Sequence, residues 1–504
     1  MVDKIINGKT RTRRQFCSFY TESDPILTYM VNKLDLAEND VILEPCAGDG
    51  VFIEKIIRTK DGNYRIDALD LNPVAVEGLI NKFRSEKVNV READTLLDST
   101  LDLFVNSNGF YTKVIGNPPY GAWQDYKKRT LLKKMYGGYV KETYTLFIKK
   151  CIDLLKEKGR LVFIIPDTFL ALHLHKDTRE KIFKETKVEE ILLIPSNFFP
   201  GVNFGYSNLC IITLEKNRNN TNNKIRILSV SNNVNNLYEL ANGNISVANL
   251  IEEVEQDKIR NSVGSAFLIG GNTKIRKLIN EAGTKLGDLA NCVTGFYSGD
   301  NKRFLAVKNH EIKGSKKFQI IDDDIIDHAF LRHKALINGL NNKKQYIPIL
   351  KGGNGRFLKD NEWFVKWDQQ TVAYYHQDRK ARFQNSQYYF REGIGVPMVK
   401  SAHPHAFLLK KRLFDQSIVG VFPKEKKHLN YILAFLNSDV CNRMTKVINH
   451  TANNSANYLK KLPIILDNKK IEEIDKIMET YFSTKDEMST ANRINSIFSE
   501  LYEI

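Results

Sequence analysis

Short apolar runs alternate with amphipathic, helix-like segments along residues 41–214, and this alternation constrains the fold more than any other feature of the chain. The runs are short and bounded by turn-forming residues, as buried strands are. Parallel strands need crossover connections, so the segments between them are expected to be helices covering both sheet faces. We predict an α/β fold with a doubly wound, Rossmann-like sheet of about seven strands. The strand candidates are a run beginning at Val41 and residues 65–71, 88–94, 111–116, 160–165, 190–194 and 208–214.

The tetrapeptide Asn117-Pro118-Pro119-Tyr120 directly follows the strand candidate 111–116. In open α/β sheets, ligands bind at the carboxyl ends of the strands. There the Asn117 side-chain oxygen and the Pro118 carbonyl can accept both hydrogens of an exocyclic amino group, while the Tyr120 ring stacks on a planar base. The two prolines stiffen this arrangement. The alternative is an ordinary strand-ending turn, because Asn-Pro and Pro-Pro are common in loops.

An earlier strand, turn and helix candidate carries glycines and carboxylates in its turn, residues 44–50. Gly48 and Gly50 allow the backbone to approach a nucleoside closely. Glu44 and Asp49 place negative charge where a phosphate-binding loop avoids it, and the Lys-Ser/Thr pair of triphosphate-binding loops is missing. A cationic cofactor without phosphate fits better, so we predict S-adenosyl-L-methionine.

Two further acids, Asp70 and Asp94, end the next two strand candidates. Asp70 stands where an acid binds ribose hydroxyls in nucleotide-binding α/β folds. Each acid alone is more often a helix cap or a solvated loop residue. Their succession before Asn117 favours a cofactor pocket.

The order of these motifs resembles the TaqI-like, gamma-class adenine-N6 DNA methyltransferases of restriction-modification systems. The resemblance rests on Phe19-Tyr20-Thr21, residues 44–50, Asp70, Asp94 and residues 117–120. It implies a catalytic domain followed by a DNA-recognition domain. It also implies transfer of a methyl group from S-adenosyl-L-methionine to N6 of an adenine flipped out of double-stranded DNA. A cognate restriction endonuclease on a separate chain is the functional partner that this resemblance implies.

The same resemblance implies roles for single residues. Thr21 and Glu44 would lie near the methionine moiety, Asp70 at the ribose and Asp94 at the adenine of the cofactor. Residues 197–202 resemble the base-stacking loop of the family, with Phe199 as the stacking ring and Phe198 as the alternative. The expected cofactor-binding residues are Tyr20, Thr21, Glu44, Pro45, Ala47, Gly48, Asp49, Gly50, Asp70, Asp94 and Asn117, and the expected catalytic residues are Asn117, Pro118, Pro119, Tyr120 and Phe199.

The reaction implied is a direct displacement that requires neither a metal nor a covalent intermediate. Cys46 follows the only proline that precedes a cysteine, but it lies in the expected cofactor turn, so we interpret it as a packing residue and not as a nucleophile. The pairs His173/His175 and His403/His405 lack a third metal ligand at useful spacing. Asp415 with residues 425–427 matches a nuclease pattern only loosely, and we expect no cleavage by this chain.

Composition agrees with a DNA-acting enzyme. The chain has 504 residues, 42% of them hydrophobic, which is enough for two or three cores. A formal charge of +16 suggests a polyanionic partner such as duplex DNA, although a solvated basic surface is the simpler alternative. The six cysteines form no Cys-x-x-Cys pair, which indicates a reducing cytoplasm. No apolar run reaches the roughly 18 residues of a membrane span.

We predict three regions. Residues 1–216 form the catalytic domain, residues 217–265 a connecting segment that begins in a polar, turn-forming run, and residues 266–504 a mixed α+β target-recognition domain with C-terminal helices. In the last region, residues 294–304 resemble a signature of recognition domains in larger methyltransferases. Aromatic and basic residues interleave between 363 and 391, either as a DNA-contacting face or as a β-rich core with snorkelling cations.

Two other functions stay open at this stage. An Asn-Pro-Pro-Tyr methyltransferase acting on RNA or on a protein glutamine needs the same chemistry, but such enzymes are usually shorter and give the basic carboxyl-terminal region no role. A DNA-binding module with a decayed cofactor pocket is the second alternative. The presence of Glu44, Asp70, Asp94 and Asn117 counts against decay.

Overall fold

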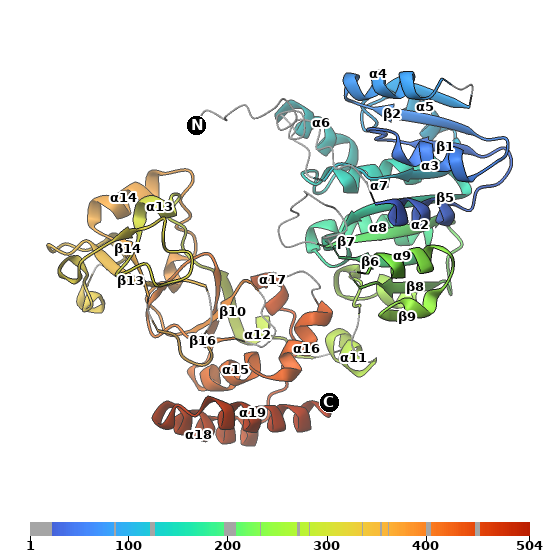
Figure 1. Cartoon of the computed structure of the whole chain (residues 1–504). Helices are drawn as coiled ribbons and strands as arrows, with labels where there is room; N and C mark the ends of the chain where they lie inside the picture. The colour runs from blue at the N-terminus through green and yellow to red at the C-terminus, as the bar shows by residue number, and fades with distance from the viewer. Residues whose placement is uncertain are drawn as a thin grey trace. The chain divides into compact units, whose positions relative to one another are not determined.

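The chain forms two compact units, Met1–Gly270 and Gly271–Ile504, in the computed structural model shown in Figure 1. None of the described helices combines the length and apolarity that crossing a bilayer requires. The structure describes residues 23–84, 87–120, 126–195, 208–231, 233–269, 273–281, 283–334, 336–352, 355–360, 362–399, 405–448 and 454–504.

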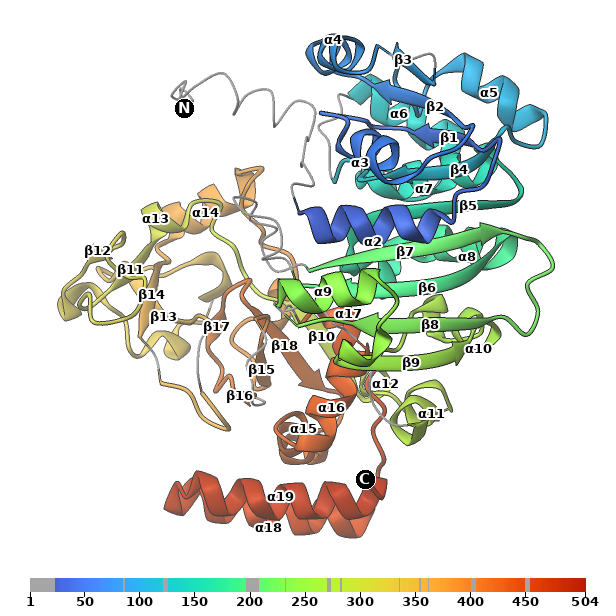
Figure 2. The same cartoon turned by 45° about the vertical axis from the view of Figure 1, so that its right-hand side comes forward.

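The first unit is built on a nine-stranded sheet in the order β3-β2-β1-β4-β5-β7-β6-β8-β9 (Figure 2). The strands from β3 to β5 in this order are parallel, whereas β7 is antiparallel to both of its neighbours. The strands span Val41–Glu44 (β1), Arg65–Asp70 (β2), Val88–Glu92 (β3), Tyr111–Gly116 (β4), Leu155–Pro166 (β5), Thr186–Ile194 (β6), Leu209–Lys216 (β7), Lys224–Ser229 (β8) and Leu250–Glu255 (β9).

Helices cover both faces of this sheet, so the expected doubly wound α/β architecture is present (Figures 1 and 2). Successive residues of β4 point to opposite faces, with Val114 in one core and Ile115 in the other. The core around Ile115 contains residues of α2 (Asp24–Leu34), α3 (Val51–Thr59), α4 (Pro73–Lys82) and α9 (Val234–Ala241). The core around Val114 contains residues of α5 (Ser99–Asn106), α6 (Tyr126–Tyr136), α7 (Thr143–Leu154), α8 (Lys176–Glu185) and α10 (Gln256–Arg260).

The expected connecting segment, residues 217–265, instead belongs to the first unit. It supplies β8 and β9, which extend the sheet beyond the seven predicted strands, and the unit ends at Gly270. The polar run at its start is an internal turn, because Asn220 is 2% exposed and its amide donates to the carbonyls of Phe183 and Thr186 at 2.9 Å each. The predicted domain boundary was therefore wrong. The polar residues of this run form a turn, and their side chains hydrogen-bond to buried backbone groups.

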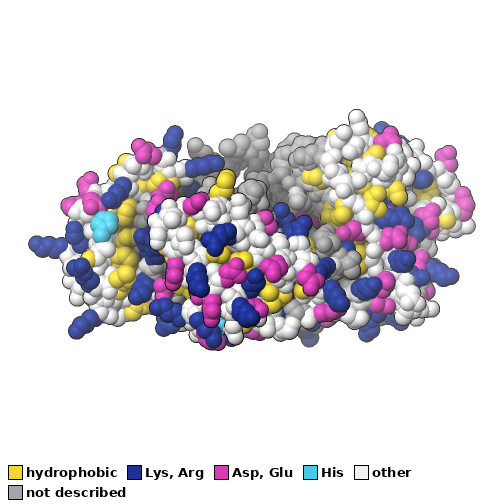
Figure 3. All heavy atoms as spheres, turned by 90° about the horizontal axis from the view of Figure 1, so that it is seen from below, with side chains coloured by type: hydrophobic (Ala, Val, Ile, Leu, Met, Phe, Trp, Pro, Cys, Tyr) yellow, Lys and Arg dark blue, Asp and Glu magenta, His cyan; other side chains and the backbone are white. Residues whose placement is uncertain are grey.

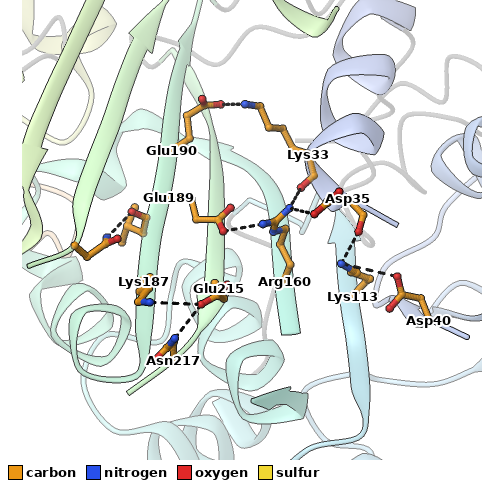
Figure 4. Close-up of polar contacts among 12 residues, drawn as sticks. Lys33, Asp35, Asp40, Lys113, Arg160, Lys187, Glu189, Glu190, Glu215 and Asn217 are labelled. Carbon is orange, nitrogen blue, oxygen red and sulfur yellow. Dashed lines mark hydrogen bonds and ion pairs between the residues drawn. The ribbon is translucent and has the colours of Figure 1, made fainter. Parts of the chain in front are cut away.

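An ion-pair network connects the end of α2 to the central strands (Figure 4). Arg160 of β5 pairs with Glu189 of β6 at 2.8 Å and with Asp35, the residue that caps α2, at 3.3 Å. Lys113 of β4 donates to the Asp35 carbonyl at 2.7 Å and lies 3.8 Å from Asp40, while burial lowers its pKa. Arg160 and Lys113 both contact Asp35, so they restrain the orientation of α2 together. An isolated surface ion pair contributes much less to such an orientation.

The second unit is mixed α+β and ends in two helices, as predicted. It contains one sheet in the order β10-β18-β15-β16 and another in the order β12-β11-β14-β13-β17. Its strands are Ala290–Thr294 (β10), Leu305–Val307 (β11), Gln319–Ile320 (β12), Tyr346–Leu350 (β13), Trp363–Lys366 (β14), Ile394–Pro397 (β15), Phe407–Leu408 (β16), Leu413–Phe414 (β17) and Ile418–Pro423 (β18). Its helices are Thr273–Glu281 (α11), Leu286–Leu289 (α12), Asn301–Phe304 (α13), Gln369–Gln377 (α14), Leu429–Leu436 (α15), Asp439–Ile448 (α16), Ala456–Leu459 (α17), Asn468–Thr484 (α18) and Glu487–Tyr502 (α19).

The interleaved aromatic and basic stretch divides between core and surface. Trp367 and Tyr375 are buried and pack with Phe296, so these rings form a core and not a DNA-contacting face. Arg379 and Arg382 are exposed. Most of the rings in this stretch thus lie in a core beneath exposed cations, whereas Tyr374 is exposed.

The signature at residues 294–304 runs from the end of β10 through a tight turn into α13. Asp300 caps this helix by accepting from the backbone N–H groups of Lys302 and Arg303, and Ser298 donates to the Asn301 side chain at 2.9 Å. Gly299 has φ 82° and leaves room for Asp378, whose Oδ2 would lie 2.5 Å from a Cβ at this position. The glycine is thus required by the turn itself.

Candidate active site

The candidate site lies where the strand order of the first unit reverses. The chain passes from β1 outward to β2 and β3 and then returns to β4 on the other side of β1, with Leu43 paired to Val114. The loops that follow β1 and β4 therefore leave the sheet side by side and in opposite directions. Such a switch point is where open α/β sheets bind ligands.

The turn after β1 has the backbone conformation that its glycines predict. Gly48 and Gly50 have φ values of 53° and 71°, and a Cβ at Gly50 would lie 2.5 Å from the Phe83 ring. The Ala47 N–H donates to the Leu69 carbonyl at 2.8 Å, and the Thr95 hydroxyl donates to the Pro45 carbonyl at 2.5 Å. Strand β2 and the loop following β3 thus fix the position of this turn.

Asp70, the last residue of β2, connects the glycine turn after β1 to the end of β2. Its two carboxylate oxygens accept from the backbone N–H groups of Gly48 and Asn72, each at 2.8 Å. Burial raises the pKa of Asp70, and these backbone donors oppose the rise. Asp70 therefore shapes the turn even without a ligand.

Asp94, two residues beyond β3, is half-buried and faces α6. Its Oδ2 lies 2.5 Å from the ammonium nitrogen of Lys128, and its Oδ1 accepts from the Leu96 N–H at 3.2 Å. The sequence did not predict Lys128 as part of the site, because the contact joins residues from separate elements.

Glu44, the last residue of β1, is the most unusual group of the site. It is 1% exposed, and its Oε2 has no hydrogen-bond partner within the described part of the chain. Burial, and then the negative charge of Asp70, raise the pKa of Glu44 well above its usual range. A buried carboxyl without a donor is costly in a purely structural role and is typical of a binding site.

Asn117 and Tyr120 contact each other within the turn after β4. The Tyr120 hydroxyl donates to Asn117 Oδ1 and also lies 3.0 Å from the Ile164 carbonyl on β5. Since Asn117 Oδ1 accepts this bond, the carboxamide orientation is fixed with its oxygen toward Tyr120. A carbonyl-type oxygen has a second lone pair with which it can accept another hydrogen.

Residues of α7 contact Pro119 and Tyr120 in the turn after β4. The Thr143 hydroxyl donates to the Pro119 carbonyl at 2.5 Å, and the Tyr144 ring meets the Tyr120 ring edge-on with centroids 6.1 Å apart. Among the described residues, none donates a hydrogen bond to the Pro118 carbonyl. The supports were not predicted, because nothing near Thr143 in the sequence points to a turn 24 residues earlier.

Cys46 lies between the two loops and is a packing residue, as its place in the sequence suggested. A Cβ at Gly116 would lie 3.5 Å from its sulfur, and the Asn117 backbone hydrogen-bonds to it. Burial, and then the charge of Glu44, raise the pKa of the Cys46 thiol, which suppresses the thiolate that nucleophilic attack requires.

Cys46→Ala is accordingly expected to lower the free energy of unfolding by about 1 kcal/mol, since it removes only one small buried group. Chemical denaturation of the purified variant tests this. An unchanged free energy of unfolding would contradict the packing role.

The structure therefore assembles most of the expected site along one edge of the sheet. Glu44, Pro45, Ala47, Gly48, Asp49, Gly50, Asp70, Asp94, Asn117, Pro118, Pro119 and Tyr120 all follow or end β1, β2, β3 or β4. Tyr20, Thr21 and Phe199 lie outside the described residues. Within the described ranges, no group of three or more His, Cys, Asp or Glu side chains is arranged to hold a metal ion.

Part of the first unit is similar to a known protein family. Residues 27–199 match the Eco57I restriction-modification methylase family. The chain is 28% identical over 222 residues to the type II methyltransferase M.HincII of Haemophilus influenzae, a match covering 42% of this chain and 39% of that protein. It is 30% identical over 161 residues to the adenine-specific methyltransferase BrxX of Escherichia coli, covering 30% and 13% of the two chains. The chain thus spans less than half of the curated relatives that it matches.

A solved structure resembles nearly the whole chain. The cryo-electron microscopy structure of a DrdV–DNA complex matches 93% of this chain and 57% of its own, with a TM-score of 0.55 and 12% identity. At this identity the likeness concerns the fold. It extends the similarity from the methylase region into the second unit.

Proposed function

We propose, from the premise that residues 27–199 form an Eco57I-type restriction-modification methylase domain, that this chain is a site-specific DNA methyltransferase. It transfers a methyl group from S-adenosyl-L-methionine to the exocyclic N6 of an adenine flipped out of duplex DNA. The observation that carries the proposal is the Asn117–Tyr120 turn beside the acidic glycine turn at the β1/β4 switch point.

The choice of an adenine amino group rests on the acceptors in this turn. An exocyclic NH2 offers two hydrogens, and Asn117 Oδ1 and the Pro118 carbonyl are two acceptors held on one short, stiff segment. A half-buried ring at Tyr120 suits a flipped base, which needs stacking to replace what it loses in the duplex. The similarity to BrxX, an adenine-specific methyltransferase, supports adenine as the target base.

The residues after β1, β2 and β3 fit S-adenosyl-L-methionine. The orphaned Glu44 oxygen suits a positively charged partner, Asp70 suits ribose hydroxyls, and Asp94 suits an adenine amino group. When bound, this group supplies a methyl carried on a sulfonium centre. We assign the remaining cofactor contacts to Tyr20, Thr21, Pro45, Ala47, Gly48, Asp49, Gly50 and Asn117.

Glu44 gives the cofactor assignment a pH signature. Its raised pKa favours the neutral acid in the ligand-free pocket, whereas a cationic ligand favours the carboxylate. Affinity for S-adenosyl-L-methionine is therefore expected to rise with pH through the raised pKa, with proton release on binding. Isothermal titration in two buffers of different ionisation enthalpy measures that release, and Glu44→Gln should abolish it and weaken binding about tenfold or more.

The stability of the ligand-free protein should change in the opposite direction. A folded-state pKa above the unfolded value stabilises the fold at low pH, and this contribution is lost as pH rises through the folded-state value. Glu44→Gln is expected to flatten that dependence in thermal unfolding. Identical pH profiles for both proteins would contradict the assignment.

Catalysis in this proposal rests on orientation and electrostatics. Asn117 and the Pro118 carbonyl orient the amine so that its lone pair faces away from them. They bind the nitrogen more strongly as it becomes positively charged, which lowers the barrier. The Tyr120 hydroxyl keeps Asn117 Oδ1 in place. Phe199 stacks on the base beside Tyr120.

The second unit, Gly271–Ile504, is proposed to recognise the DNA sequence. The net charge of +16 and exposed cations such as Arg379 and Arg382 suit a polyanion. A separate restriction endonuclease of matching specificity is the proposed functional partner, because methylation would protect host DNA from it.

The proposal is tested by modification-sensitive sequencing of DNA from a methylation-deficient host that expresses this chain. N6-methyladenine at one short motif supports base, activity and specificity together. Unmodified DNA, despite folded protein that binds S-adenosyl-L-methionine, would redirect the assignment to the second candidate, RNA or a protein glutamine.

A further inference from the structure

Helix α6, residues 126–136, carries the densest positive charge of the first unit. It contains Lys127, Lys128, Arg129, Lys133 and Lys134 and no acidic residue. No other described α-helix of the chain carries more than two cations without an acid of its own. Helix α8, by contrast, pairs Lys176 with Glu180 and Lys181 with Glu185.

The exposed lysines of α6 take no part in the ion pairs that stabilise the described fold. Lys127, Lys133 and Lys134 are exposed, and they form no ion pair with the part of the chain that the structure describes. On the face shown in Figure 3, Lys and Arg side chains are interspersed with Asp and Glu, as is usual for a solvated surface. Three exposed lysines on one helix without a described carboxylate partner are a different arrangement, because their positive potential is not offset by ion pairs of their own.

The helix is docked at the active-site edge of the sheet. Leu132 is fully buried in the core, the Tyr136 hydroxyl donates to the Leu96 carbonyl at 2.8 Å, and Lys128 pairs with Asp94. Leu96 and Asp94 both follow β3 at its carboxyl end. The same contacts that anchor α6 thus place its lysines beside the proposed cofactor pocket.

The helix is also close to the target-base turn along the chain. Only residues 121–125 separate Tyr120 from the start of α6, and six residue steps of about 3.3–3.6 Å reach no more than about 22 Å. Each DNA strand carries a phosphate about every 3.4 Å of helix axis. Several phosphates on either side of a base held at Tyr120 would therefore lie within reach of α6.

We propose that α6 binds the phosphate backbone of the substrate duplex next to the flipped nucleotide, through Lys127, Lys133 and Lys134. The catalytic unit then holds DNA directly and does not depend on the second unit alone. Because phosphate contacts carry no base information, α6 contributes affinity and position without sequence preference. This inference rests on the proposed function, since it needs DNA as the substrate.

The test is the salt dependence of DNA binding by the full-length triple variant K127Q/K133Q/K134Q. Each lost phosphate contact should reduce the slope of log affinity against log salt by about 0.9, or about 2.7 for three. We expect weaker binding, by at least about tenfold near 0.15 M salt, equally for duplexes with and without the target motif. Binding of S-adenosyl-L-methionine should be unchanged, since Lys128 and Asp94 are intact.

The matched control is K158Q/K184Q/K224Q, which removes the same charge from exposed positions of the same unit. Lys158 and Lys224 lie near the amino ends of β5 and β8, and Lys184 lies in the last turn of α8, which leads into β6. All three are thus at the edge opposite the site, and this control should keep the wild-type slope within about 0.5.

Equal slopes for the two triple variants overturn the α6 proposal while leaving the proposed function intact if wild type still methylates DNA. Wild type that binds cofactor but neither binds nor methylates DNA overturns both.

Discussion

Asn117→Ala should lower the methyl-transfer rate about 10²–10³-fold, the usual effect of removing one preorganised polar group that acts on developing charge. The side chain is held by the Tyr120 hydroxyl, so its oxygen is positioned before the substrate arrives. Alanine removes that oxygen but keeps the backbone N–H, which hydrogen-bonds Cys46. Single-turnover transfer of labelled methyl to duplex DNA measures the loss. Affinity for S-adenosyl-L-methionine should fall far less than the rate.

Two variants sharpen this result. Asn235→Ala makes the same change on the exposed first turn of α9 and should keep wild-type activity. Tyr120→Phe keeps the ring but removes the hydroxyl, so a loss of about tenfold, close to one hydrogen bond, is expected. If Asn117→Ala keeps more than about a tenth of the wild-type rate, its carboxamide does not act on the reacting amine.

The sequence predicted the parts of the fold that local patterns encode. Residues 111–116 form β4 as expected, because a short run rich in β-branched and aromatic residues directly before Asn-Pro-Pro favours a strand. Residues 45–50 form the predicted turn between a strand and a helix, in which Gly48 and Gly50 have positive φ values. The polar run before β8 was wrongly predicted to begin a linker. Composition does not distinguish a linker from a turn whose side-chain amides hydrogen-bond to buried carbonyls.

Within the site, the sequence identified residues but not their partners. Asp94 and Asn117 were predicted from their positions at strand ends. Their partners were not, because Lys128 contacts Asp94 and Thr143 contacts the turn of Asn117 from other elements. The unpartnered Glu44 oxygen is likewise a property of packing. Such contacts arise only when the sheet order brings the loops together, and a single sequence does not contain that information.

The largest stability effect is expected at Arg179, a fully buried arginine of α8. Its guanidinium donates to the carbonyls of Phe169 at 2.6 Å, Leu172 at 2.9 Å, Gly264 at 2.8 Å and Ser265 at 3.0 Å. It thereby joins the loop after β5 to the last segment of the first unit. Arg179→Met leaves four carbonyls without this donor, and we expect a loss of about 3–5 kcal/mol in the free energy of unfolding.

At about 2–4 °C per kcal/mol for a domain of this size, that loss lowers the melting temperature of the first unit by roughly 10 °C. Arg58→Met is the matched control, because Arg58 is exposed and, among the residues that the structure describes, pairs only with Glu54 one helical turn away. Such a pair contributes about 0.3–0.5 kcal/mol, so the control should melt within about 2 °C of wild type. Similar melting temperatures for both variants in calorimetry would mean that water replaces the guanidinium at the four carbonyls. A lower melting temperature for Arg179→Met alone, with faster hydrogen exchange in residues 264–269, would instead show that the Arg179 side chain holds this last segment against the rest of the first unit.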